Sequence, residues 1–145
     1  MAVGEEHFRR LVSMYGQAPC NLPLKPILQI SDGHAELRMQ ATPEMHHAAG
    51  SVHGSFYFKM LDDAAYFAAN SKVTDVLVLT VSFTLHMMLP VEEGLLRATG
   101  RVVRAGERML FAESALIDAQ GRDLARGSGV FARSNVRLTE ESGYR

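Results

Sequence analysis

The central part of the sequence, residues 53–69, is apolar on most sides but carries two adjacent carboxylates, Asp62 and Asp63. The apolar pattern predicts a buried helix, in which an unpaired carboxylate would be costly. One stripe of this helix would gather Lys59, Asp62, Asp63, Tyr66 and Asn70. Two interpretations remain open: a solvent-exposed face on which Lys59 pairs with Asp63, or a cleft in which one aspartate is a general base or nucleophile.

The start of the same helix is a second candidate for chemistry. The first backbone N–H groups of a helix have no intrahelical partner and point beyond its N-terminus. A glycine at that point, Gly54, allows a carbonyl group to approach the backbone closely. The sequence His53-Gly54-Ser55 therefore indicates a place where an oxyanion could be stabilised.

These candidates depend on the elements that position them. Periodicity and turn residues predict a short helix over 4–16, a hairpin of strands 26–31 and 35–41 around Asp32-Gly33, and the long helix from 53 to about 70. Four strands follow, over 76–89, 95–105, 109–118 and 124–133, and 136–145 is expected to be frayed. The short connections favour an α+β fold in one domain, 1–145, with an antiparallel sheet around the long helix.

The strand over 76–89 is expected to bury one face and leave the other partly polar. The expected core face comprises Leu77, Leu79, Val81, Phe83, Leu85, Met87 and Leu89. The expected polar face comprises Thr80, Ser82, Thr84 and His86.

The composition excludes several classes of protein. With 145 residues, 47% of them hydrophobic, the chain can form one sizeable core, and a net charge of -1 argues against nucleic acid or an anionic membrane as a partner. The polar N-terminus, the absence of an apolar run of about 18 residues and the single cysteine, Cys20, lead us to expect a cytoplasmic protein. Cys20 is expected to be buried. The spacing of His46, His47 and His53 fits no zinc pattern, so no metal site is expected.

Several spaced motifs together resemble one family, the hotdog-fold acyl-CoA thioesterases of the phenylacetate-degradation type, within the 4-hydroxybenzoyl-CoA thioesterase superfamily. The likeness runs from about residue 45 to residue 132. It rests on Gly50-x-x-His53-Gly54-Ser55, Leu61-Asp62-x-Ala64, Thr80-x-Ser82-Phe83, Pro90-x-x-x-Gly94 and the turn at Gly121.

The resemblance implies hydrolysis of an acyl-CoA to a carboxylic acid and free coenzyme A, without a metal or redox cofactor. It implies that the Gly54 N–H polarises the thioester carbonyl, that Asp62 is the base or nucleophile, that Thr80 helps to hold the attacking water, and that His53 lines the site. In the family the glycine and the aspartate come from opposite subunits of a dimer, and tetramers are frequent. A helical separation of about 12 Å between Gly54 and Asp62 also requires a homodimer at minimum.

Two positions depart from the family pattern. Ser55 stands where a second glycine is common; it retains a backbone donor beside the substrate, with less conformational freedom. His47 stands where asparagine is usual; its imidazole can still donate a hydrogen bond, but its charge can change near neutral pH.

Other parts of the substrate site are predicted from residue type. Arg104, Arg108 and Arg126 are candidates for the phosphates of coenzyme A, although a single arginine on a strand is usually solvated. Candidates for the acyl pocket are Phe56, Met60, Met87 and Met88, and for each of these core filling is the alternative. A non-catalytic acyl-CoA-binding sensor or regulatory module remains the alternative function.

Overall fold

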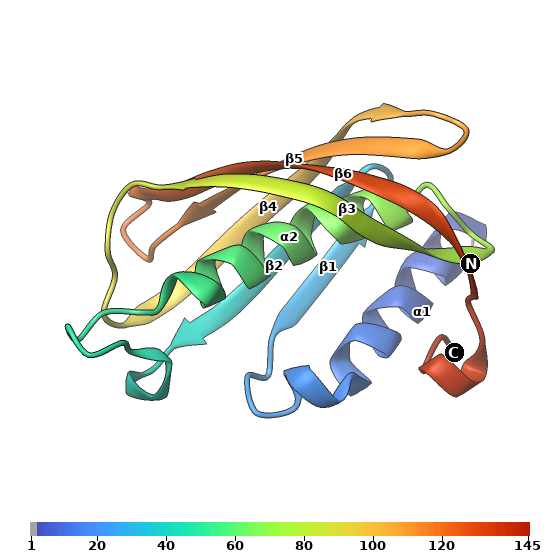
Figure 1. The fold of residues 1–145 in the computed structure, drawn as a ribbon. Coiled ribbons are helices and arrows are strands. Elements are labelled where there is room, and N and C mark those ends of the chain that lie inside the picture. Colours follow the sequence, from blue (N-terminus) through green and yellow to red (C-terminus); the bar gives the residue numbers. More distant parts are fainter. Residues whose placement is uncertain (1–2) are drawn as a thin grey trace.

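The computed structural model of the chain describes residues 3–145, and the first two residues of the polar N-terminal stretch lie outside the described residues. Figure 1 shows a curved sheet wrapped around one long helix, with a second helix beside it. The described chain forms a six-stranded, wholly antiparallel sheet in the order β1-β2-β4-β5-β6-β3. Its strands are β1 (Ile27–Ser31), β2 (His34–Ala41), β3 (Val76–Met87), β4 (Gly94–Ala105), β5 (Met109–Ile117) and β6 (Asp123–Arg137). The predicted α+β architecture is confirmed.

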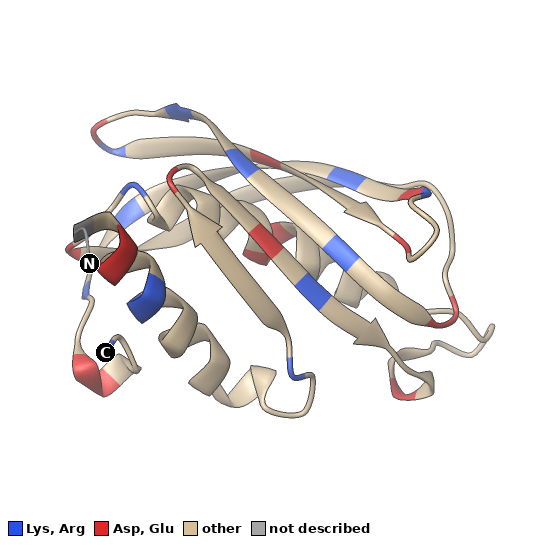
Figure 2. Cartoon of the chain, turned by 180° about the vertical axis from the view of Figure 1, so that it is seen from behind, with Lys and Arg blue, Asp and Glu red and all other residues tan. Residues whose placement is uncertain are grey.

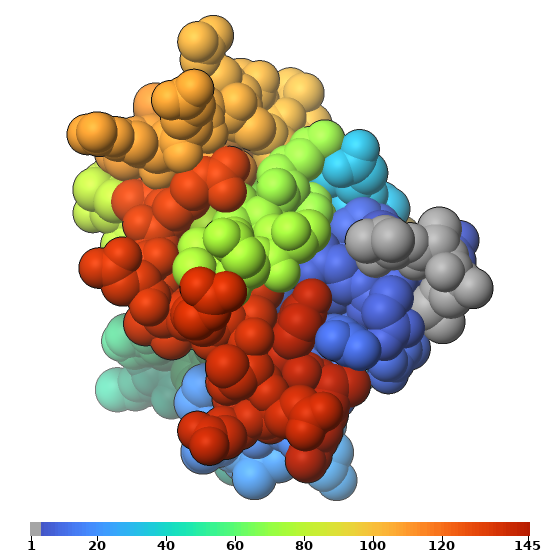
Figure 3. All heavy atoms as spheres, turned by 90° about the vertical axis from the view of Figure 1, so that its right-hand side faces the viewer, coloured from blue at the N-terminus to red at the C-terminus, as the bar shows by residue number. Residues whose placement is uncertain are grey.

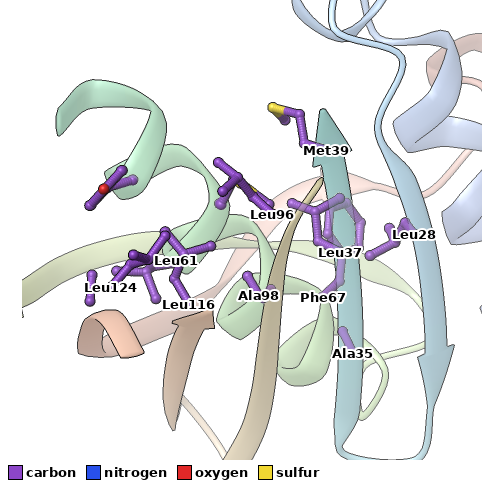
Figure 4. Close-up of a cluster of buried hydrophobic side chains, with 14 of the residues drawn as sticks. Leu28, Ala35, Leu37, Met39, Leu61, Phe67, Leu96, Ala98, Leu116 and Leu124 are labelled. Carbon is purple, nitrogen blue, oxygen red and sulfur yellow. The ribbon is translucent and has the colours of Figure 1, made fainter. Parts of the chain in front are cut away.

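The long helix, α2 (Gly54–Asn70), packs against the concave side of this sheet. Its apolar face fills the core, where Leu61 and Phe67 meet side chains of β2, β4 and β5 (Figure 4). The strand residues of this cluster are wholly or almost wholly buried and include Leu37, Met39, Leu96, Ala98 and Leu116. Burial of an apolar side chain of this size contributes about 1.5–3 kcal/mol to folding. Burial of this apolar face therefore fixes the rotation of α2 about its axis, and with it the direction in which Asp62 points.

The strand β3 differs from its prediction. It lies at the edge of the sheet, and register shifts at Val76/Val78 and at Thr80/Ser82 break the alternation that a regular strand would have. Val78 is consequently buried, whereas three residues expected in the core are more than half exposed: Leu79, Val81 and Met87. The sequence pattern missed the exposure of Leu79 and Val81 because a bulge changes which side chains share a face without changing the residue types. Met87 lies beyond both bulges, at the end of the strand.

The first helix, α1 (Val3–Gln17), packs along β1 and is followed by a short 3-10 helix, η1 (Pro19–Asn21). Cys20 lies in η1 and is exposed, contrary to the expectation of a buried side chain. Across residues 3–145, no helix combines the length and the apolar character that a membrane span needs.

The C-terminal segment is ordered, so the prediction of a frayed segment over 136–145 is wrong. The strand β6 continues to Arg137, and a 3-10 helix, η3 (Glu140–Ser142), follows. Figure 3 shows the last residues lying against the N-terminal helix. They are held by a hydrogen bond of 2.7 Å between the Tyr144 hydroxyl and Nδ1 of His7. These two residues are too far apart in the sequence for a local pattern to predict their contact.

Candidate active site

Asp62 and Thr80 meet where the middle of α2 crosses the edge strand β3. The Thr80 hydroxyl donates a hydrogen bond of 2.9 Å to Oδ1 of Asp62. Partial burial raises the pKa of Asp62 from 3.8 to about 6; the Thr80 hydrogen bond opposes this rise, and the nearby charge of Asp63 adds to it. Asp62 is therefore a carboxylate that can accept a proton at moderately acidic to neutral pH, as a general base must.

Asp63, although adjacent in sequence, has a different environment. Its Oδ2 accepts hydrogen bonds from Lys59 Nζ at 2.9 Å and from the Tyr15 hydroxyl at 2.6 Å. Burial, reinforced by the Asp63 charge, raises the pKa of Tyr15 far above its usual range, so the hydroxyl stays protonated and donates. The predicted pairing of Asp63 with Lys59 is thus present, and the two aspartates have different hydrogen-bond partners.

Tyr15 is a site residue that the sequence reading missed. Its position on the apolar face of α1 indicated only helix packing, and nothing in the sequence links it to a residue 48 positions away. Its ring also packs edge-on against Phe67, with a centroid separation of 5.0 Å. Through these contacts α1 is fixed against the helix that carries Asp62.

A cavity of about 690 Å³ opens beside Asp62 and Thr80. Volumes of this size are typical of small-molecule sites in proteins. Its lining is mainly apolar or aromatic near the aspartate and includes Tyr66, Phe67, Leu77 and Leu79. The wall across from α2 and β3 comes from the end of α1, from η1 and from residues 141–143. Asp62 therefore faces a ligand-sized space.

The start of α2 is capped by a histidine side chain. Nδ1 of His53 accepts a hydrogen bond of 3.0 Å from the Ser55 backbone N–H, and the Ser55 hydroxyl lies 2.8 Å from the same nitrogen. Because a backbone N–H can only donate, a neutral His53 must carry its proton on Nε2. Ser55 thus orients His53 as an Nε2–H donor while it stabilises the helix start.

Gly54 lies at a second, smaller cavity of about 340 Å³, which His47, Met87 and Met88 also line. No described residue accepts a hydrogen bond from the Gly54 N–H. A Cβ at this position would lie 2.7 Å from Sδ of Met87, so glycine leaves room that another residue would fill. His47 is exposed, and its Nδ1 accepts from the Ala49 N–H at 3.0 Å, which leaves Nε2 as a donor when the ring is neutral. Several N–H donors therefore lie at or beside one cavity.

Two of the predicted acyl-pocket residues have other positions. Met60 is completely buried, so it fills the core and lines neither cavity, which corrects the predicted acyl-pocket role. Phe56 is partly buried and packs against the same core. Both face inward because they lie on the side of α2 that the sheet covers.

The predicted phosphate-binding arginines lie away from the cavities at Asp62 and at Gly54, and Arg126 lines another cavity of about 270 Å³. Arg104 is exposed on β4, and Arg108 follows in the turn to β5. Arg126 lies on β6, with its Nη2 3.4 Å from Oδ1 of Asp123. Figure 2 shows basic and acidic residues interspersed along the strands on this side of the molecule. A role toward coenzyme A stays a prediction for all three.

Among residues 3–145, no cluster of three or more His, Cys, Asp or Glu side chains has the geometry to hold a metal ion. His46 instead donates from Nε2 to the Glu92 carbonyl at 2.6 Å, and His47 and His53 lie with their ring centroids 6.4 Å apart. The three histidines therefore do not converge on one point.

The two candidate regions of one chain are separate. Asp62 and Thr80 line one cavity and Gly54 lines the other. Gly54 and Asp62 are eight residues apart on α2. At about 1.5 Å of rise per residue, a single carbonyl group cannot reach both. Any reaction that uses both needs a second chain.

Comparison with known families identifies the superfamily of this chain. Residues 49–125, just over half of the chain, match the family described as the thioesterase superfamily, and the protein belongs to that superfamily. The matched range contains α2, Asp62 and Thr80, but not α1 or the C-terminal segment. No curated protein sequence matches the chain.

Solved structures show the same fold. The chain is similar to the E. coli PaaI protein from the phenylacetic acid degradation operon, with a TM-score of 0.85 and 21% identity over 95% of this chain and 100% of that one. A putative thioesterase from Ralstonia eutropha, a phenylacetic acid degradation-related protein, gives 0.75 and 24% over 87% and 98% of the two chains. A thioesterase from Haemophilus influenzae gives 0.77 and 11% over 86% and 88%. The predicted hotdog fold is confirmed.

Proposed function

We propose that this protein hydrolyses acyl-CoA thioesters to a carboxylic acid and free coenzyme A. The observation that carries the proposal is the Thr80–Asp62 hydrogen bond of 2.9 Å beside a cavity of about 690 Å³, with the pKa of Asp62 raised to about 6 by burial. Membership of the thioesterase superfamily supports the same reaction class. No metal or redox cofactor is needed for it.

In the proposed reaction, a water molecule binds between the Asp62 carboxylate and the Thr80 hydroxyl. Asp62 takes one proton from the water as its oxygen attacks the thioester carbonyl carbon, giving a tetrahedral oxyanion. Collapse of this intermediate breaks the C–S bond, and the proton held by Asp62 passes to the departing sulfur. Alternatively, Asp62 attacks the carbonyl directly, expels the thiolate and forms a mixed anhydride that water then hydrolyses. Both routes end in the same acid and thiol.

The oxyanion needs donors, and the start of α2 offers them. The Gly54 N–H has no hydrogen-bond partner among the described residues. It lies in the first turn of α2, at the positive end of the helix dipole. His47 lines the same cavity with an available Nε2–H. We assign the carbonyl oxygen to the Gly54 N–H, with His47 as a second donor in place of the amide that the family uses.

The assignment requires at least a homodimer, in which Gly54 of one chain and Asp62 of the other act on one substrate; a tetramer would be a pair of such dimers. Two features support a partner along β3. It is an edge strand with unpaired backbone groups, and apolar side chains near it are exposed, among them Phe58, Val81 and Met87. In such an assembly Met87 and Met88, at the Gly54 cavity, would contact the substrate, and Arg104, Arg108 or Arg126 would meet the phosphates. The reaction also fits a cytoplasmic location, where acyl-CoAs are made and used.

The test is release of free thiol from a panel of acyl-CoAs, comprising phenylacetyl, hydroxybenzoyl and straight-chain thioesters. Wild type and Asp62→Asn are compared side by side, with binding measured on the same panel. Turnover that the substitution abolishes supports the thioesterase and ranks its substrates. Binding without turnover across the whole panel would contradict it and favour the acyl-CoA sensor.

A further inference from the structure

The wall of the Asp62 cavity comes in large part from segments outside the family match. The matched range, residues 49–125, supplies the side with Asp62 and Thr80. The facing side consists of the end of α1, η1 and the C-terminal segment, with lining residues that include Met14, Gln17, Ala18, Cys20, Ser142 and Gly143. The part of the chain that matches the family model thus supplies Asp62 and Thr80, whereas segments outside that match bound the space next to them.

The C-terminal part of this wall is held by a buried histidine. His7 is 3% exposed; its Nε2 lies 2.8 Å from the carbonyl oxygen of Asn70, at the end of α2, and its Nδ1 lies 2.7 Å from the Tyr144 hydroxyl. A carbonyl oxygen only accepts, so Nε2 donates to it and Nδ1 accepts from the tyrosine. One side chain of α1 therefore ties the C-terminal segment to the helix that carries Asp62.

Backbone geometry brings the same segment close to α1. Gly143 has a φ of +89°, a conformation that favours glycine, and a Cβ there would lie 3.3 Å from Cα of Met14. The guanidinium of Arg145 donates to Oε1 of Gln17 at 3.1 Å. Figure 3 shows the C-terminal segment, in red, lying against the N-terminal helix, in blue. The C-terminal segment therefore packs closely against α1 and forms part of the cavity wall.

We propose that the wall formed by the end of α1, η1 and residues 139–145, held by the His7–Tyr144 hydrogen bond, sets the longest acyl group that the enzyme accepts. The inference rests on the proposed function. Because the carbonyl carbon reacts at Asp62, an acyl chain that enters this cavity runs away from the aspartate and ends on the wall. In an apolar pocket, one methylene group too many changes kcat/KM by roughly 10- to 200-fold, so a wall of this kind gives a sharp limit.

The experiment measures kcat/KM for a series of straight-chain saturated acyl-CoAs, from about four to about sixteen carbons, in steps of about two carbons. Tyr144→Ala removes the hydrogen bond and the ring, and is expected to raise kcat/KM for the first excluded chain length by about tenfold or more relative to the shortest substrate. Tyr144→Phe keeps the ring and is expected to shift the limit in the same direction by less.

A second variant acts in the opposite direction without breaking a side-chain contact. Ala18 lines the cavity and has ordinary backbone angles, so Ala18→Phe fills space and is expected to shorten the longest accepted chain. Ala105→Phe, on the exposed end of β4 and away from the cavity, is the matched control and should leave the profile unchanged. Thermal melting establishes that each variant is folded.

The two failures are distinguishable. A wild type that hydrolyses no acyl-CoA contradicts the proposed function itself. If the wild type hydrolyses acyl-CoAs but shows the same length limit as Ala18→Phe and Tyr144→Ala, the wall does not set the limit. The same holds if the wild type shows no length limit at all. Either result leaves the proposed thioesterase activity in place.

Discussion

The Thr80 hydroxyl donates to Oδ1 of Asp62 at 2.9 Å, and this contact joins the edge strand of the sheet to the central helix. It gives Asp62 a polar partner that faces a cavity, while the neighbouring Asp63 is occupied by Lys59 and Tyr15. Two adjacent carboxylates on one helix thereby have different partners, and we propose a catalytic role for Asp62 alone.

Substitution of the two aspartates should separate these roles. Asp62→Asn removes the group that accepts the proton, and we expect turnover to fall by about 10²-fold or more. Asp63→Asn keeps an amide oxygen that can still accept from Tyr15, so its turnover should remain close to wild type. Steady-state thiol release measures both variants, and equal losses would contradict the assignment.

The pH dependence of the reaction should reflect Asp62. Its pKa is raised to about 6 by burial, and the base works only when it is ionised. We expect kcat/KM to rise with pH through a midpoint near 6 and then level off. A rate profile for the wild type tests this expectation. The residual activity of Asp62→Asn should lack that transition; an unchanged midpoint in the variant would assign the ionisation to another group.

The same shift has a consequence for stability. A carboxyl whose folded pKa lies above its ordinary value of 3.8 favours folding when protonated, and this contribution is lost as pH rises through about 6. Asp62→Asn should therefore be more stable than wild type above that pH, by about 1–2 kcal/mol after allowance for solvent screening, and nearly equal to it at about pH 4. Urea unfolding at both pH values gives the difference. If Asp62→Asn is instead less stable than wild type at neutral pH, burial does not destabilise the ionised Asp62 carboxylate.

The contact between α1 and α2 should depend on one hydroxyl. Tyr15→Phe keeps the ring against Phe67 but removes the 2.6 Å hydrogen bond to Asp63. We expect a loss of about 1.5–3 kcal/mol in the free energy of unfolding, as for other hydrogen bonds to charged groups. Denaturant unfolding measures it, with Tyr57→Phe as a matched control in which the partner is a neutral carbonyl, that of Leu89. Equal effects in the two variants would remove the special role of the charged partner.

The local sequence pattern was sufficient to predict the central helix and the first hairpin. The apolar periodicity of α2 and the turn at Gly33 gave the helix and the first hairpin, and Gly33 has the positive φ, +70°, that such a turn needs. The spacing of Asp62 and Thr80, interpreted through a family resemblance, placed both in one site, and the two side chains do meet.

The features that the sequence did not reveal depend on contacts between distant residues. Tyr15 and Asp63 are 48 positions apart, and His7 and Tyr144 are 137 apart, so neither pair has a local signal. The exposed apolar residues of β3 were assigned to the core because bulges in an edge strand leave no mark in composition. Residue type makes Met60 a candidate for either the acyl pocket or the core, and only the packing of α2 shows that it faces the core.

The proposed thioesterase site is assembled from two chains, with Asp62 from one and Gly54 from the other. Complementation tests it most directly. Asp62→Asn and Gly54→Val are prepared separately, mixed under conditions that exchange subunits, and assayed for thiol release. Each variant alone should be nearly inactive, and equal mixing should restore about a quarter of the wild-type activity, because about half of the dimers are mixed and each of these holds one intact site. Mixtures no more active than their components, although mixed dimers form, would contradict the shared site.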